Sequence, residues 1–93
     1  MEFEWDARKA VENLAKHGVD FVRAIRIFSD PRRLERESDP DTYGEIRRKV
    51  IGRIDEEVYA VVYAPRGAVY RIISARKASR RERRSYRTRP HAS

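Results

Sequence analysis

The stretch VYAVVYAPRGAVYRIISARK, residues 58–77, decides the fold class. It contains two runs rich in β-branched and aromatic residues, which favour strands, over Glu57–Ala64 and Val69–Ala75. Pro65-Arg66-Gly67 separates the two runs, and Gly67 is able to take the positive φ that a hairpin turn requires. We therefore predict an antiparallel hairpin in this part of the chain.

The flanking sequence extends this hairpin on both sides. Upstream, Ile46–Ile54 predicts a third strand, joined by Asp55-Glu56. Downstream, Ser79-Arg80-Arg81-Glu82 has the pattern of a capping box and predicts a helix to about Arg87. The polar segment from Arg32 to Tyr43 gives only a faint signal for a short strand near Leu34.

Two helices are predicted before the sheet. Asp6 is a good N-cap for a helix over Ala7–His17, and Gly18 follows as its left-handed C-terminal residue. The apolar stripe of this helix consists of Ala10, Val11 and Leu14. Asp20 caps a second helix over Phe21–Phe28, which Asp30-Pro31 ends.

The order helix, helix, antiparallel sheet, helix is typical of an α+β fold. Glu2–Trp5 is expected to form a short strand or an extended arm. We expect one domain over residues 1–87 and a flexible tail over residues 88–93.

Composition excludes several classes of protein. The 93 residues include no cysteine and two histidines. The absence of cysteine excludes a disulfide framework, and with so few potential ligands we expect neither a metal site nor a cofactor. No apolar run approaches the ~20 residues of a membrane span. The acidic start, Met1 to Asp6, lacks a signal-peptide pattern, so we expect a cytoplasmic protein.

The positive charge is concentrated in the last quarter of the chain. Nine cations lie between Arg71 and Pro90 against one acid, Glu82, whereas residues 1–70 are nearly neutral. Eight of the nine are arginines, whose planar guanidinium groups suit phosphate. This segment predicts a nucleic-acid or acidic-protein partner, and the alternative is a solvated helix face.

Three sets of residues resemble the BrnT family, the ribonuclease toxins of BrnT–BrnA type II toxin–antitoxin systems. The sets are Phe3-Glu4-Trp5-Asp6 with Lys9, Asn13, Lys16-His17-Gly18-Val19 and Phe21; Arg47 with Ile51-Gly52; and Arg71-Ile72-Ile73-Ser74-Ala75-Arg76-Lys77-Ala78 with Glu82-Arg83 and Tyr86. The sparse segment from Arg32 to Tyr43 departs from the family, in which a strand is expected there.

The resemblance implies a RelE-like fold, with two N-terminal helices packed on a small antiparallel sheet and a C-terminal helix. It implies RNA cleavage that inhibits translation and growth. It also implies a BrnA-like ribbon-helix-helix antitoxin as partner, in a two-plus-two heterotetramer that contacts operator DNA through the antitoxin.

Metal-independent RNA cleavage needs a base for the 2′-OH, an acid for the leaving 5′ oxygen and cations for the phosphorane. Arg71 and Arg76 are the first candidates for the phosphate clamp. Alternatively, Arg71 forms a core ion pair with Glu82. Ser74 shares the face of Arg76 and is either a phosphate donor or an ordinary sheet hydroxyl. Arg47 either approaches the same face or protects an edge strand.

The first helix carries a further candidate row. Lys9, Asn13 and Lys16 share one helix face, and His17 follows Asn13 by four residues. Histidine titrates near neutral pH, so His17 is either an acid or base of the site or a cation that caps the helix C-terminus.

The last helix adds Glu82, Tyr86 and the RNA-binding candidates Arg80 and Arg83. Glu82 is either a general base, weakened by its cationic neighbours, or simply part of the capping box. The resemblance implies that Tyr86 contacts the RNA base or 2′-OH, and the alternative is core packing.

Two other functions compete with a ribonuclease toxin. One is a non-catalytic nucleic-acid-binding module, and the other is an interaction protein whose basic helix docks an acidic partner. Neither a helix-turn-helix nor an RNP signature supports the binding module.

Overall fold

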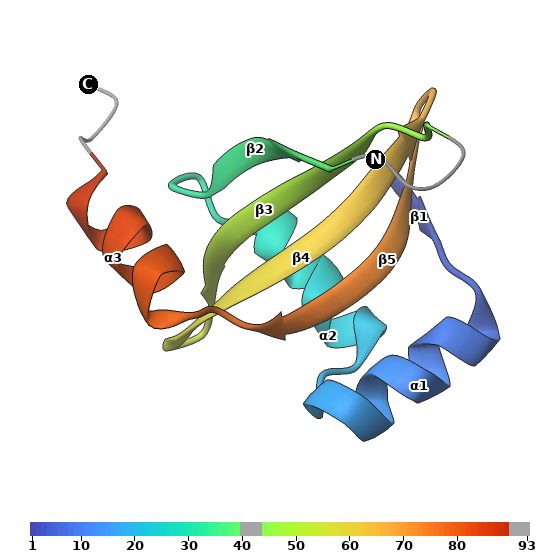
Figure 1. Ribbon diagram of the computed structural model, residues 1–93, viewed down its shortest axis with the longest axis horizontal. Helices are drawn as coiled ribbons and strands as arrows, with labels where there is room; N and C mark the ends of the chain where they lie inside the picture. The colour runs from blue at the N-terminus through green and yellow to red at the C-terminus, as the bar shows by residue number, and fades with distance from the viewer. Residues whose placement is uncertain (40–43, 90–93) are drawn as a thin grey trace.

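The computed structural model describes residues 1–39 and 44–89, in which five strands form one sheet of order β1-β5-β4-β3-β2 (Figure 1). Helices lie on both sides of the sheet, which confirms the α+β class. The strands are β1 (Glu2–Glu4), β2 (Leu34–Ser38), β3 (Arg47–Ile54), β4 (Glu57–Arg66) and β5 (Val69–Lys77). The helices are α1 (Ala7–His17), α2 (Phe21–Ala24), the 3-10 helix η1 (Ile25–Ser29) and α3 (Arg80–Thr88).

The two predicted hairpins, β3–β4 and β4–β5, form the centre of the sheet. Strands β4 and β5 are each two residues longer than predicted. Pro65 and Arg66 pair with Tyr70 and Val69, so the turn between the strands shortens to two residues. Gly67 takes its positive φ of 60° in this turn.

The sheet is mixed, and the prediction that it is wholly antiparallel is wrong. β1 pairs in parallel with β5, from Glu2 opposite Val69 to Glu4 opposite Arg71, because β5 would otherwise present a free edge. Of the two alternatives expected for Glu2–Trp5, the short strand is therefore the one present, as β1. The faint strand near Leu34 is present as β2, antiparallel to β3.

Helix α1 has the predicted caps but not the predicted buried stripe. Asp6 accepts hydrogen bonds from two free amides, and Gly18 ends the helix at φ 71°. The side chains of Val11 and Leu14, however, are 69% and 51% exposed. The reason is that α1 docks on the edge of β5 through another face, which carries the buried Asn13.

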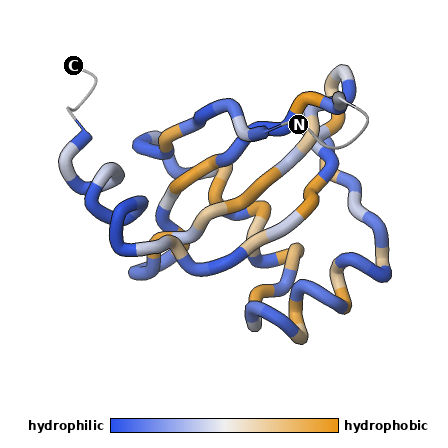
Figure 2. The backbone as a smooth tube through the Cα atoms, in the orientation of Figure 1, coloured by the Kyte–Doolittle hydropathy of each residue, from blue (hydrophilic) through white to orange (hydrophobic). Residues whose placement is uncertain are grey.

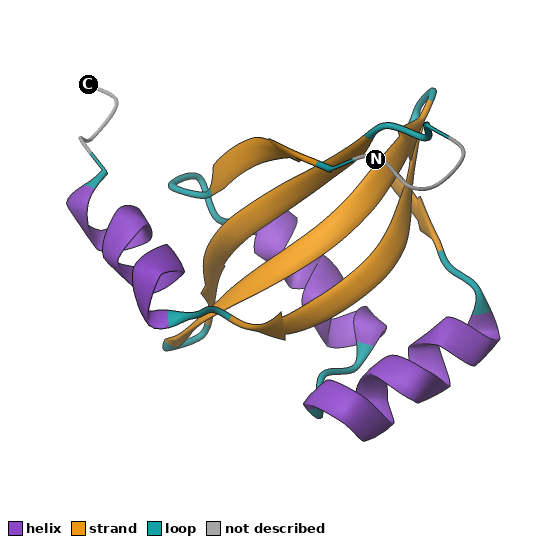
Figure 3. Ribbon diagram, viewed as in Figure 1, coloured by secondary structure: helices purple, strands orange, loops and turns teal. Residues whose placement is uncertain are grey.

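The second predicted helix is split, because α2 continues as the tighter η1 rather than as α-helix to Phe28. Both pieces lie behind the sheet in Figure 3 and pack on its apolar core, which includes Phe21, Ala24 and Ile27. A Cβ on Gly52 would lie 2.7 Å from Cγ1 of Ile27. Glycine at this position therefore lets η1 approach β3 closely.

Helix α3 packs on the other side of the sheet, at the end away from α1 (Figure 1). It is hydrophilic along its length (Figure 2), and its buried Tyr86 contacts Ile51 and Ala60. The capping box predicted for Ser79 and Glu82 is present. The helix includes Thr88, which was expected in the tail, while residues 90–93 of that tail lie outside the described residues.

Candidate functional site

A bulge in β5 decides which side chains share the face of the sheet that carries α3, here called the open face. Val62 pairs with Ser74 and Tyr63 with Ile72, so Ile73 is an extra residue. Residues directly opposite each other in a sheet project to the same side. Arg71, Ser74 and Arg76 pair with Ala64, Val62 and Ala60, which alternate with the core residues of β4. The bulge therefore places both arginines on the open face, whereas an unbroken strand would place them on opposite faces.

The open face and α1 enclose a cleft of about 580 Å³, here called the basic cleft. Its cations come from four different elements: Lys9 of α1, Arg47 of β3, Arg66 of β4 and Arg71 of β5. Gly44, Glu45 and Ile73 complete the lining. Three of the residues proposed from sequence, which are far apart in the chain, thus meet around one cavity.

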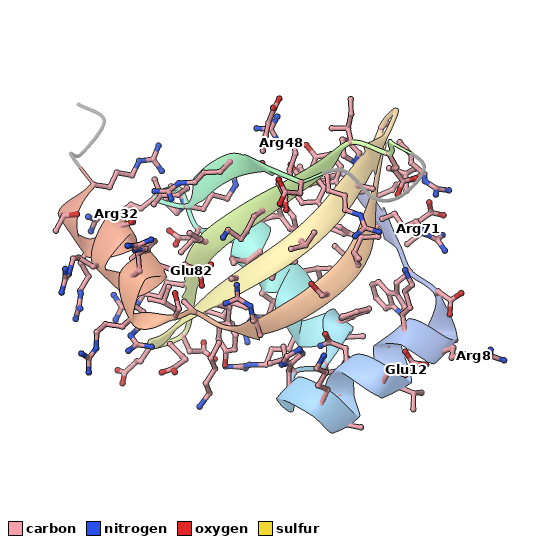
Figure 4. The ribbon with its side chains drawn as sticks, viewed as in Figure 1. Arg8, Glu12, Arg32, Arg48, Arg71 and Glu82 are labelled. Atoms are coloured by element: carbon pink, nitrogen blue, oxygen red, sulfur yellow. The ribbon has the colours of Figure 1, made fainter. Side chains whose placement is uncertain are left out.

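Arg71 projects into this cleft from the side of the molecule nearest β1 (Figure 4). Arg71 forms an ion pair with Glu4, in which the two charged groups are 3.8 Å apart and the side chains of Arg71 and Glu4 are 26% and 42% exposed. The alternative of a core ion pair with Glu82 is wrong, because Glu82 is bound to other cations. Arg71 therefore keeps a solvent-accessible guanidinium group.

A second pocket, of about 230 Å³, adjoins the basic cleft and shares Lys9 and Ile73 with it. Lys16 and His17 line it from α1, and Ser74 lines it from the open face. Glu12 and Asn13 complete the lining. The predicted row on α1 therefore faces the strand that carries Arg71.

Asn13 makes this arrangement rigid. Its amide group donates to the carbonyl oxygens of Ala75 and Val19, at 2.8 and 3.0 Å, and accepts from the Ala75 N–H at 3.0 Å. The side chain thereby pairs with the edge of β5 as a further strand would. Asn13 was predicted to lie within the row, but its structural role was missed, because nothing in its sequence neighbourhood indicates a partner 62 residues away.

The remaining predicted residues form a separate cluster beneath α3. The Glu82 carboxylate is 7% exposed and accepts from Arg76 at 2.7 and 3.0 Å, from Lys49 at 2.8 Å and from the Ser79 N–H at 2.8 Å. The Arg76 hydrogen bonds, assisted by Lys49, hold the pKa of Glu82 far below its usual range. These contacts engage both oxygens of the Glu82 carboxylate. None of these residues lines the basic cleft.

Tyr86 belongs to the same cluster. It is 7% exposed and donates its hydroxyl to Asp30 at 2.6 Å. Burial and this hydrogen bond raise the pKa of Tyr86 to about 12, so the phenol stays neutral at physiological pH. Arg83 donates to the Ala78 carbonyl, and Arg80 is exposed on α3. Tyr86, Arg83 and Arg76 therefore anchor α3, and Arg80 lies on its exposed surface. None of these side chains lines the basic cleft.

Two cleft residues were missed from sequence, Arg66 and Glu45. Their side chains form an ion pair at 2.9 Å. Arg66 was assigned to a turn, and Glu45 fell between the polar segment and the predicted strand. The pairing of β3 with β4 brings the two residues together. The one local signal is that Glu45 precedes Arg47 by two residues, which places both on one side of an extended segment.

Within residues 1–39 and 44–89, no group of three or more His, Cys, Asp or Glu side chains has the arrangement of a metal site. None of the helices in that part of the chain is long and apolar enough to cross a membrane.

Comparison with known proteins identifies one family. The family model described as "Ribonuclease toxin, BrnT, of type II toxin-antitoxin system" matches residues 5–82, well over half of the chain. No curated protein matches the chain. The matched range includes α1, all of β2 to β5 and the start of α3, and it confirms the resemblance drawn from the motifs.

Proposed function

We propose that this chain, which belongs to the BrnT family of ribonuclease toxins of type II toxin–antitoxin systems, cleaves RNA in the basic cleft. The observation that carries the assignment of the site is the meeting of four cations from four elements around one cavity. Cations held in this way before the substrate arrives stabilise charge that develops during a reaction. We also regard the arrangement of elements as a variant of the RelE-like fold.

In the proposed reaction the 2′-OH of the RNA attacks the adjacent phosphorus and the bond to the 5′ oxygen breaks. Arg47, Arg66 and Arg71 stabilise the negative charge on the phosphorane. Lys9 donates a proton to the leaving 5′ oxygen. The adjoining pocket, with Lys16, His17 and Ser74, holds the neighbouring phosphate. Arg80 and Arg83 on α3 attract the flanking RNA.

The proposed reaction uses no metal, because the attacking group belongs to the substrate and arginine and lysine supply the positive charge. Incubation of the purified chain with a long RNA in excess EDTA tests this directly. Cleavage that persists in EDTA supports the proposal. Binding without cleavage would instead indicate a binding module, and neither binding nor cleavage would indicate a protein-interaction role.

RNA affinity is expected to fall steeply with ionic strength. Each phosphate neutralised on a single strand contributes about −0.7 to the slope of log affinity against log salt, so four cleft cations predict a slope of about −3. Fluorescence anisotropy with a labelled single-stranded RNA, over a range of salt concentrations, measures this slope. An affinity that does not respond to salt would contradict the proposed cleft.

We further propose that the cleavage inhibits translation in the cytoplasm and that a BrnA-like ribbon-helix-helix antitoxin neutralises it. The antitoxin would cover the basic cleft and α3 with acidic residues, form a two-plus-two heterotetramer and carry the complex to operator DNA.

Expression of the chain alone is expected to stop growth of the host, and co-expression of the antitoxin is expected to restore it. Growth curves after induction, with and without co-expression of a BrnA-like antitoxin, measure this effect. Normal growth of a host that accumulates the folded wild-type chain alone would contradict toxicity.

A further inference from the structure

Among the described residues, one carboxylate lines the basic cleft together with its cations. Glu45 lies two residues before β3, and its side chain is 29% exposed. The other charged groups in this part of the lining are Lys9, Arg47, Arg66 and Arg71, and all of them are cationic. A carboxylate accepts hydrogen bonds and protons, whereas lysine and arginine side chains act as donors.

The other acidic groups near the open face are engaged elsewhere. Glu82 is buried under α3 by Arg76 and Lys49, and Glu4 lies on β1 outside the lining of the cleft. Glu35 lies on the opposite side of the sheet, where it accepts a hydrogen bond from Tyr63. Glu12 and His17 line the adjoining pocket and not the basic cleft. Among the described residues that line the basic cleft, only Glu45 has the chemistry of a proton acceptor.

We propose that Glu45 is the general base of the RNA cleavage reaction, an inference that rests on the proposed function. The Glu45 carboxylate takes the proton of the 2′-OH as the O2′–P bond forms, and the P–O5′ bond breaks as Lys9 protonates the 5′ oxygen. The products are a 2′,3′-cyclic phosphate and a free 5′-OH, and the enzyme is reset when solvent takes the proton from Glu45 and supplies one to Lys9.

Arg66 is assigned the role of a positioning residue for this base. Its guanidinium group binds one carboxylate oxygen of Glu45 at 2.9 Å from the neighbouring strand. A base must be held within hydrogen-bond reach of the proton it removes. Arg66 fixes the carboxylate beside Arg47 and Arg71, where the scissile phosphate would bind.

The test is the Glu45→Gln variant, whose amide oxygen still accepts a hydrogen bond from Arg66 while it loses basicity. Cleavage of a single-stranded RNA is expected to slow by about 10²–10⁴-fold, the usual contribution of a general base. RNA affinity is expected to stay equal or to rise, because a negative charge leaves the cleft. The matched control is Glu37→Gln, an exposed position on β2, which is expected to cleave as the wild type does.

The dependence of the cleavage rate on pH separates a base from a structural anchor. Carboxylates titrate in the acidic range, whereas the lysine and arginine side chains around Glu45 do not. The wild-type rate is expected to fall on acidification, and Glu45→Gln is expected to lose this acidic limb. Wild-type cleavage and an unchanged pH profile in Glu45→Gln would overturn the role of Glu45 and leave the ribonuclease assignment standing. A wild-type chain that cleaves no RNA would overturn both.

Discussion

Replacement of Arg71 by alanine is expected to reduce RNA cleavage about 10²–10³-fold and to abolish toxicity. The guanidinium group of Arg71 lines the basic cleft, where it would contact the phosphorane. Loss of one such preorganised donor typically has an effect of this size.

The same substitution is expected to leave the fold nearly unchanged. The carboxylate of Glu4, the ion-pair partner of Arg71, is 3.8 Å away and its side chain is 42% exposed, so water solvates it once the arginine is gone. Exposed ion pairs contribute about 0–1 kcal/mol to stability.

Thermal unfolding and RNA cleavage measured on the same Arg71→Ala sample distinguish the two roles. Arg8→Ala is the matched control, because Arg8 on α1 points away from the sheet (Figure 4) and its removal changes the net charge equally. A large fall in melting temperature would assign Arg71 to structure. Native stability with full cleavage would remove it from the site.

The Glu82→Gln substitution is expected to destabilise the protein by about 2–3 kcal/mol. Glutamine keeps the capping-box hydrogen bond but leaves the cations Arg76 and Lys49 together without an anion. Loss of one partner of a buried pair costs about 3–5 kcal/mol, and the partial exposure of both cations reduces this figure. In a domain of this size the melting temperature should fall by roughly 10–20 °C.

The pH dependence of stability provides the second measurement on Glu82. The pKa of this carboxyl is depressed in the folded state, so its ion pairs stabilise the fold above the unfolded-state pKa of about 4.3. That stability is lost as pH falls from this value through the folded-state pKa. Glu82→Gln is expected to be less stable at neutral pH and less sensitive to acid.

Glu57→Ala serves as the control for Glu82, because Glu57 pairs with Lys77 at 3.8 Å on the surface and should change stability by less than about 1 kcal/mol. Equal melting temperatures for wild type and Glu82→Gln would show that the buried ion pairs contribute nothing to the docking of α3.

Features set by local chemistry were predictable from the sequence. Asp6, Gly18 and Ser79 mark helix ends through contacts with residues two to four positions away, and all three behave as expected. The hairpin strands follow from β-branched and aromatic runs, whose preference for extended backbone is also local.

Features set by contacts between distant segments were not predictable in the same way. The parallel pairing of β1 with β5 depends on which edge of the sheet remains free, and the exposure of Val11 and Leu14 depends on which face of α1 docks. In the same way, Glu45 and Arg66 come together only through strand pairing. Three of the five charged residues among the described cleft lining were therefore recognisable from residue type, whereas Arg66 and the acidic Glu45 were not.

The bulge at Ile73 lets the length of β5 vary without moving its arginines. Arg71 and Arg76 are five positions apart in the chain, an odd separation that would place them on opposite faces of a regular strand. Because Ile73 is the extra residue, a chain without it would have a regular strand in which the two arginines, four positions apart, still share the open face. Loss of this one residue is therefore a change in strand length that the charged surface of the protein can absorb in the course of evolution.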